Sequence, residues 1–291
     1  MNRISYYLTQ PFIYLISLCP FFLLYGISDI TFLLVYYVIG YRKKIVYENL
    51  RNSFPDKSEK EIKHIQLNYY RYLCDLGLET LKTLTISREK SLKHCYLTPE
   101  TVDLFNRYYT ENKSVIIVLG HLGNWEWAGN AFSLQCKHQL YVIYHPFTNP
   151  LFDKLIIKTR TRFGTQLIPM KDTFRQMTKN KTVCSATAFI ADQTPSPENA
   201  HWTTFLNQET AVFKGTELMA NRFNYPVIFI QVERVRRGYY AVKAEAQTEH
   251  PADTARGYIS EWHTQVLEKC INLKPETWLW SHRRWKHKKP A

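Results

Sequence analysis

The sequence predicts an α/β fold with a central mixed sheet covered by helices, preceded by an apolar N-terminal helix. Three observations lead to this prediction. Short apolar segments alternate with helical stretches beyond residue 113, residues 45–110 have helical periodicity, and the first forty residues are mostly apolar. We therefore divide the chain into an N-terminal apolar segment, residues 1–44, and one larger domain, residues 45–291.

The N-terminal segment has the composition of a membrane anchor. Residues 8–27 carry no charge and just reach the roughly 20 apolar residues that a spanning helix needs. Pro20 predicts a kink or a break, so we expect either one kinked transmembrane helix or two shorter helices lying partly in the membrane. A buried hairpin of a soluble protein is the weaker alternative. Basic residues 42–44 follow, which would leave the rest of the chain on the cytoplasmic side of a membrane.

Helix signals and then strand signals follow along the chain. Ser58 and Glu61 predict a capping box before the apolar periodicity of residues 62–84, and Thr98 predicts an N-cap before Pro99. The predicted strands are residues 114–120, 140–144, 183–192 and 226–232, with an edge or antiparallel strand at 239–246. A final amphipathic helix is expected from about residue 253 to 272.

Charge and cysteine content limit the possible partners. The net charge of +13 predicts an acidic partner, such as an anionic membrane surface, a phosphorylated substrate or an acidic protein. Nucleic acid is disfavoured, because the chain has neither a predicted recognition helix nor a stacking sheet. The six cysteines lack the spacing of a zinc site, so we expect reduced thiols and no metal centre.

The segment GHLGNWEWAG, residues 120–129, is the strongest candidate for chemistry. His121 follows a predicted strand, at the end of the sheet where ligands gather in open α/β folds. Glu126 would lie in the first turns of the next helix and reach back to the imidazole, which fixes its tautomer and raises its basicity. Gly120 and Gly123 would allow a tight turn. The alternative is a structural one, a helix cap beside a hydrogen-bonded histidine.

The sequence lacks the common motifs of other enzyme classes. The pair is not HExxH, and the chain contains no GxSxG elbow, no phosphate-binding loop and no dinucleotide fingerprint. A base without a nucleophile of its own indicates that the nucleophile belongs to the substrate.

Five segments in order resemble one known family. GHLGNWE is similar to the HxxxxE/D motif of the lysophospholipid acyltransferase superfamily. YENLRNSFPDKSEKE, YHPFTNPLFDKLIIKTRTRFG, ADQTP and PETWLWSHRRWK resemble segments of its bacterial branch, the lipid A late (secondary) acyltransferases. Together these segments extend from about residue 41 to residue 287. The resemblance implies a membrane-anchored, glycerolipid acyltransferase-like α/β fold, with the acyltransferase domain over residues 45–291.

The resemblance also implies roles for individual residues. His121 would be the general base that deprotonates an acceptor hydroxyl, Glu126 would orient it, and no acyl-enzyme would form. Arg160 and Arg162 would stabilise the oxyanion or bind a phosphate, unless they form a solvated basic helix face. Asp192 and Gln193 would line the same cleft or cap the next turn. For the tail after residue 275, we expect WLW to be packed facing the membrane and the basic residues to bind an anionic headgroup or an acidic carrier protein.

The family therefore implies transfer of a fatty acyl chain to a hydroxyl of a lipid A precursor, at the cytoplasmic face of a bacterial inner membrane. The donor would be the thioester of acyl carrier protein, with no cofactor, and the partners would be that protein, a phosphorylated glycolipid and the anionic membrane. One rival keeps the chemistry with a lysophospholipid or aminolipid acceptor. Another is a non-catalytic protein that binds anionic lipid through its basic face.

Overall fold

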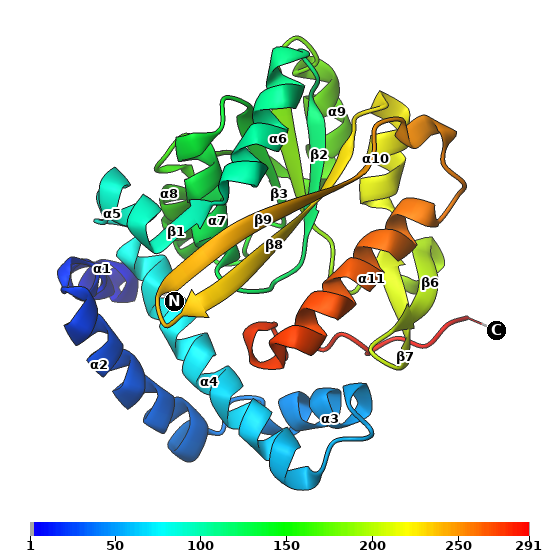
Figure 1. Cartoon of the computed structure of the whole chain (residues 1–291). Coiled ribbons are helices and arrows are strands. Elements are labelled where there is room, and N and C mark those ends of the chain that lie inside the picture. The colour runs from blue at the N-terminus through cyan, green and yellow to red at the C-terminus, as the bar shows by residue number, and fades with distance from the viewer. Residues whose placement is uncertain (1–2, 291) are drawn as a thin grey trace.

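The computed structural model describes residues 3–290, and a seven-stranded sheet forms its centre (Figure 1). The strands of this sheet are β1 (Cys95–Leu97), β2 (Val115–Leu119), β3 (Gln139–Tyr144), β4 (Gln166–Pro169), β5 (Ser185–Ile190), β8 (Val227–Arg236) and β9 (Tyr239–Thr248). Their order in space is β1-β9-β8-β2-β5-β3-β4, and the β8–β9 pair alone is antiparallel. A separate hairpin joins β6 (Ala200–Phe205) to β7 (Gln208–Phe213). The predicted mixed sheet is confirmed.

Helices occupy most of the remaining chain. They are α1 (Arg3–Leu18), α2 (Phe21–Leu33), α3 (Lys43–Ser53), α4 (Glu59–Lys82), α5 (Arg88–His94), α6 (Pro99–Thr110), α7 (Trp125–Gln135), α8 (Pro150–Thr161), α9 (Thr173–Lys179), α10 (Gly215–Phe223) and α11 (Tyr258–Leu273). Short 3-10 turns include η2 (Met170–Asp172), η4 (Pro251–Asp253) and η5 (Pro275–Thr277), and a π-helix, η1 (Leu34–Ile39), continues α2. The predicted capping box is confirmed, since the Ser58 backbone N–H donates to Glu61 at 2.8 Å. Thr98 caps α6 as expected.

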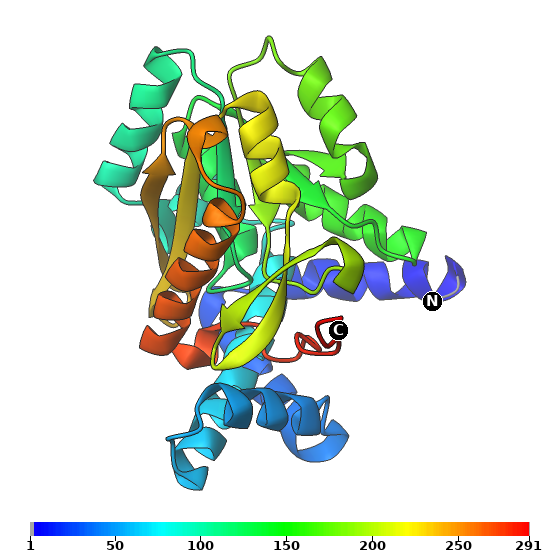
Figure 2. The same ribbon diagram turned by 90° about the vertical axis from the view of Figure 1, so that its right-hand side faces the viewer.

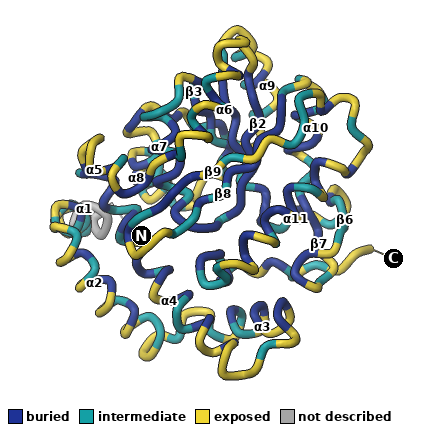
Figure 3. The backbone as a smooth tube through the Cα atoms, viewed as in Figure 1, coloured by how far each residue is buried: buried dark blue, intermediate teal, exposed yellow. Residues whose placement is uncertain are grey.

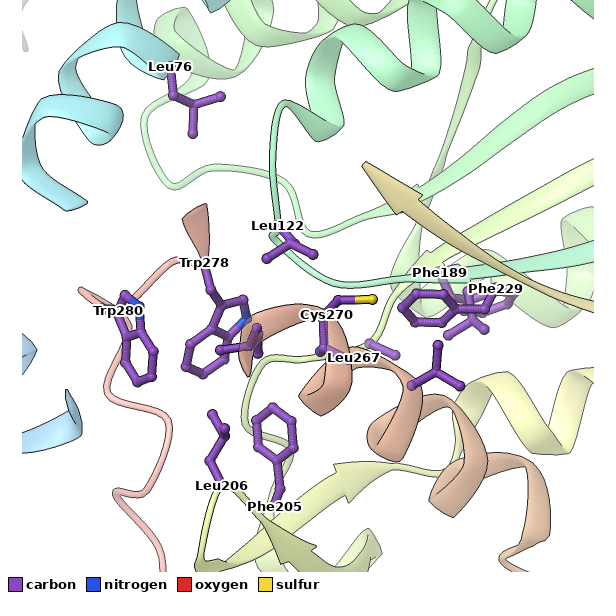
Figure 4. Close-up of a cluster of buried hydrophobic side chains, with 14 of the residues drawn as sticks. Leu76, Leu122, Phe189, Phe205, Leu206, Phe229, Leu267, Cys270, Trp278 and Trp280 are labelled. Atoms are coloured by element: carbon purple, nitrogen blue, oxygen red, sulfur yellow. The ribbon is translucent and has the colours of Figure 1, made fainter. Parts of the chain in front are cut away.

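Two hydrophobic clusters lie on the two faces of the sheet. Side chains alternate between the faces along a strand, so Ile117 and Leu119 of β2 pack with α6 and α7, whereas Ile116 and Val118 pack on the opposite side. Figure 2 shows α10 and α11 in front of this second face. Figure 4 shows its core, where Leu267 and Cys270 of α11 lie between strand phenylalanines and the buried Trp278 and Trp280.

The N-terminal segment forms two helices that pack against α4. As expected, the chain breaks at Pro20, between α1 and α2. Ser28 on α2 donates to Asp75 on α4 at 2.7 Å, and Tyr25 donates to Glu79 at 2.9 Å. The uninterrupted apolar helix is therefore Phe21–Ile39, rather than residues 8–27. Among residues 3–290 it is the one helix that is long and apolar enough to cross a membrane, by length and composition alone.

Much of the surface of these helices is exposed (Figure 3), and many of the exposed side chains are apolar. The largest exposed fractions of apolar side chains here are 80% for Phe22, 75% for Val38, 68% for Ile39, 67% for Phe12 and 65% for Leu18. A fully buried hairpin is thus excluded for this segment. An apolar surface of this kind is typical of a protein or membrane contact.

The sequence missed several short elements. β1 has only three residues, and the β6–β7 hairpin is rich in polar residues, so neither gives a clear apolar run. The segment 239–246 is antiparallel as expected, but β1 pairs with it and covers the edge. The final helix begins at Tyr258 and not near residue 253. The η4 turn and the left-handed Gly257, with φ of 91°, come before it.

Candidate active site

Two neighbouring parallel strands bring His121 and Asp192 together. His121 follows β2 and Asp192 follows β5, and Leu119 pairs with Ile190 at the ends of these strands. Nδ1 of His121 lies 2.6 Å from Oδ1 of Asp192, and the His121 backbone N–H donates to Oδ2 at 2.7 Å. This position at the carboxyl ends of the strands is the one that the sequence predicted for the site.

Asp192 is a buried, ionised carboxylate. Its side chain is 3% exposed, and Trp278 donates its indole N–H to Oδ2 at 2.8 Å. Burial alone would raise the pKa of Asp192, but the charge of His121 and the three hydrogen bonds outweigh it and lower the pKa to about 2. The carboxylate therefore accepts a hydrogen bond from Nδ1–H, and in a neutral imidazole this tautomer leaves the lone pair on Nε2. Nε2 lies 3.4 Å from the amide nitrogen of Gln193.

Glu126 does not contact the imidazole through a hydrogen bond, contrary to our expectation. It lies in the first turn of α7 as predicted, but Arg160 of α8 binds both of its oxygens, with Nη2–Oε1 at 2.6 Å and Nε–Oε2 at 2.9 Å. The carboxylate that is hydrogen-bonded to His121 is therefore Asp192. Glu126 was expected because it lies in the same motif, whereas Asp192 follows β5 and is 71 residues further along the chain.

The Glu126–Arg160 pair lies beside His121. Their side chains are 12% and 18% exposed. Burial would raise the pKa of Glu126, but the charge and hydrogen bonds of Arg160 and the nearby His121 lower it. The Trp125 ring connects the two pairs, since it stacks edge-on with His121 at 4.9 Å and donates to Glu126 at 3.2 Å.

The two candidate arginines, Arg160 and Arg162, bind different parts of the structure. Arg160 points to Glu126, whereas Arg162 donates through Nη1 to the carbonyl of Thr83, near the end of α4. Arg162 thus holds α8 against α4 and lies outside the site. Asp192 and Gln193 both lie next to His121, with Oδ1 and the amide nitrogen at 2.6 Å and 3.4 Å from the ring nitrogens, and their role in a substrate cleft stays a prediction.

The loop that carries His121 depends on its glycines. Gly123 has φ of 61°, and a Cβ there would overlap the carbonyl of Val232. At Gly120, a Cβ would lie 2.7 Å from Leu267. Asn124 then caps α7 by accepting from Trp127 at 2.9 Å, and its amide donates to the buried Glu79 at 2.8 Å. The loop is thereby fixed to α4 and to both faces of the sheet.

An apolar groove begins directly beside Asp192. Its volume is about 300 Å³, which is at the lower end of the range for small-molecule sites. Its floor includes Ile190 and Ala191, the last residues before Asp192, and its walls include Phe174 and Met219. A second apolar cavity, of about 50 Å³, lies under α7. Trp125 and Gly129 line both this cavity and a smaller one at Glu126 and Arg160.

The C-terminal tail supplies residues whose location differs from the one that the sequence favoured. Trp278 and Trp280 are buried and do not face outward, so the expected membrane-facing role of WLW is wrong. Trp278 instead binds Asp192, and Arg284 is only 3% exposed, whereas its neighbour Arg283 is exposed. The apolar character of the tryptophans fits both locations, so composition alone could not distinguish them.

Comparisons with known proteins agree on one family. The family described as "Bacterial lipid A biosynthesis acyltransferase" matches residues 2–287. A lipid A biosynthesis lauroyltransferase of Escherichia coli K12 is 24% identical over 249 residues, which cover 84% of this chain and 79% of the relative. A lipid A biosynthesis palmitoleoyltransferase of the same organism and a lipid A biosynthesis acyltransferase of Shigella flexneri are each 23% identical over the same shares.

Proposed function

Because this chain belongs to the bacterial lipid A biosynthesis acyltransferase family and is thus an acyltransferase, we propose that it transfers a fatty acyl chain from acyl carrier protein to a hydroxyl of a lipid A precursor. The observation that carries the mechanism is the His121–Asp192 pair. Its Nδ1 proton is held by an ionised carboxylate, and Nε2 remains available to a substrate. The side chain of His121 is 14% exposed, so an acceptor could reach it.

His121 would act as a general base. Nε2 takes the proton of the acceptor hydroxyl while the oxygen attacks the thioester carbon, which forms the new C–O bond. The C–S bond then breaks, and the protonated imidazole returns the proton to the thiolate. In residues 3–290, no serine, threonine or cysteine side chain is hydrogen-bonded to the ring. This supports direct transfer without an acyl-enzyme.

Arg160 and the apolar groove would hold the donor. The intermediate carries negative charge on the former carbonyl oxygen, and Arg160 is the cation next to the base, held in place by Glu126. The groove beside Asp192 would take the acyl chain, because it is apolar and is the larger of the two cavities.

The surface of the protein supports a location of the reaction at the inner membrane. The exposed apolar side of α1 and α2 would lie in the inner membrane, with the sheet on the cytoplasmic side. The net charge of +13 suits acidic partners, namely acyl carrier protein, a phosphorylated disaccharide and anionic lipid.

The deciding experiment measures label transfer from an acyl carrier protein thioester to a lipid A precursor. We expect wild-type membranes to transfer label, and His121→Ala to reduce the rate by about 10²- to 10⁴-fold. His64→Ala, on the exposed surface of α4, is the matched control and should remain active. A His121→Ala enzyme with most of its activity would refute the base, and wild-type preference for a lysophospholipid or aminolipid would refute the acceptor. Transfer by neither protein to any acceptor would favour simple binding of anionic lipid.

A further inference from the structure

A buried arginine faces the carboxylate that holds the base. Arg284 is 3% exposed, and its Nε and Nη1 atoms have no hydrogen-bond partner among residues 3–290. His263 on α11 is 4% exposed, and its Nε2 is likewise unpaired within the same residues. Native proteins seldom leave such buried polar atoms without a partner, because the desolvation of each atom is then uncompensated.

The two side chains line the same cavity as Asp192. The volume of this cavity is about 10 Å³, which is the space that one buried water molecule needs. Its remaining wall is largely apolar, with Phe205, Phe229 and Leu267. Thr264 also lines the cavity, but its hydroxyl donates to the carbonyl of Ser260 at 2.7 Å. Asp192, His263 and Arg284 remain, which matches the two to four hydrogen bonds that a buried water makes.

We propose that Arg284 is a positioning residue for the His121–Asp192 pair, which acts through one water molecule bound between Arg284, His263 and Asp192. The arginine keeps the carboxylate in place and charged behind the base, without touching the substrate. This inference rests on the proposed role of His121. The inference adds to the proposed site a positioning residue from the C-terminal tail, which lies outside both the His121 loop and the Glu126–Arg160 pair.

The charges around the pair favour this role for Arg284. Burial lowers the pKa of its guanidinium to about 10, so the group is positive at neutral pH. The other titratable groups that face the pair are two histidines, a tyrosine and an ion pair: His263, His282, Tyr72, and Glu126 with Arg160. Burial lowers the pKa of both histidines to about 4 and raises that of the tyrosine, so all three are neutral at pH 7. Arg284 is thus the positively charged group that shares a cavity with Asp192.

Neighbouring arginines allow a matched test. Arg284→Met removes the buried charge at similar volume, and Arg283→Met removes an exposed charge one residue away. Without the positive charge of Arg284, the His121–Asp192 pair should take up a proton more easily, and thus at a higher pH. We therefore expect the acid limb of kcat/KM against pH to move upward by about one pH unit, with the alkaline plateau changed less than about threefold. Arg283→Met should leave the limb unchanged.

A second readout does not depend on activity. The Nδ1–H···Oδ1 hydrogen bond of 2.6 Å should give a downfield proton resonance, absent in Asp192→Asn. We expect this resonance to move upfield or broaden in Arg284→Met and to persist in Arg283→Met. A crystal structure should show one water within hydrogen-bond distance of Arg284 and His263.

The outcomes separate this inference from the function itself. Wild-type protein without transfer activity, but with a resonance sensitive to Arg284, would refute the proposed function and support the inference. Loss of activity at all pH values with an unmoved limb and an unmoved resonance would show a merely structural arginine. If Arg284→Met does not fold, Arg284→Gln tests the same loss of charge with one donor kept, and a wild-type limb and resonance in it would overturn the proposal.

Discussion

Two carboxylates flank the loop that carries His121, and they bind different kinds of group. Asp192 binds a titratable group, the imidazole of His121, and is fixed by a backbone N–H and by the Trp278 indole. Glu126 binds a permanent cation, Arg160, through both oxygens. Among residues 3–290, no cation other than the imidazole binds Asp192 directly, and under our proposal Arg284 acts on it only through a water molecule, so the charge of this carboxylate would act on His121. Arg160 compensates the charge of Glu126, and Glu126 in turn holds the Arg160 guanidinium in place.

The regions behind the two carboxylates differ as well. Beside Asp192 lie the groove of about 300 Å³ and the small cavity at Arg284. Beside Glu126 lies a cavity of about 30 Å³, which shares Trp125 and Gly129 with the cavity of about 50 Å³ under α7. We infer that the Asp192 side holds the base and the acyl chain, while the Glu126 side holds the oxyanion.

The largest expected effect comes from neutralising Asp192. Asp192→Asn leaves the geometry nearly unchanged, but it no longer selects the tautomer with a lone pair on Nε2. We expect kcat to fall about 10³-fold or more, measured by label transfer to the lipid A precursor. Asp253→Asn, at an exposed position before α11, should be silent. An Asp192→Asn enzyme within tenfold of wild type would show that Glu126 can orient the base after all.

A smaller loss is expected on the other side. Arg160→Met should lower kcat about 10²-fold, because one donor to the oxyanion is lost. Arg162→Met serves as the matched control from the same segment, because Arg162 binds the carbonyl of Thr83 outside the site. It should lower thermal stability slightly and leave kcat within about threefold. Equal losses in the two variants would mean that Arg160 acts through helix packing.

The sequence predicted the positions of the candidate residues in the fold better than the contacts between them. A histidine after one strand and an aspartate after another could be placed at the same end of a sheet from pattern alone. The strand order that makes β2 and β5 neighbours could not, because β3 and β4 come between them in the chain but not in space. The Glu126–Arg160 pair also depends on how α8 packs. The burial of Arg284 beside exposed Arg283 leaves no trace in the local pattern.

The smallest expected effect concerns where the acyl chain lies. Met219→Trp narrows the groove on the Asp192 side, and we expect the preferred donor to become shorter, with selectivity changed about tenfold. Leu218→Trp, one residue away and 58% exposed, is the control.

On the Glu126 side, Gly129→Ala is the corresponding variant. Its Cβ fits, since it would lie 3.9 Å from Leu140, and it removes space from the cavity under α7. Competition between acyl carrier protein donors of different chain length measures both. A shorter preference in Gly129→Ala with none in Met219→Trp would move the acyl chain to the side of Glu126. The oxyanion and the chain would then share one side of the site, and the groove beside Asp192 would be left to the acceptor.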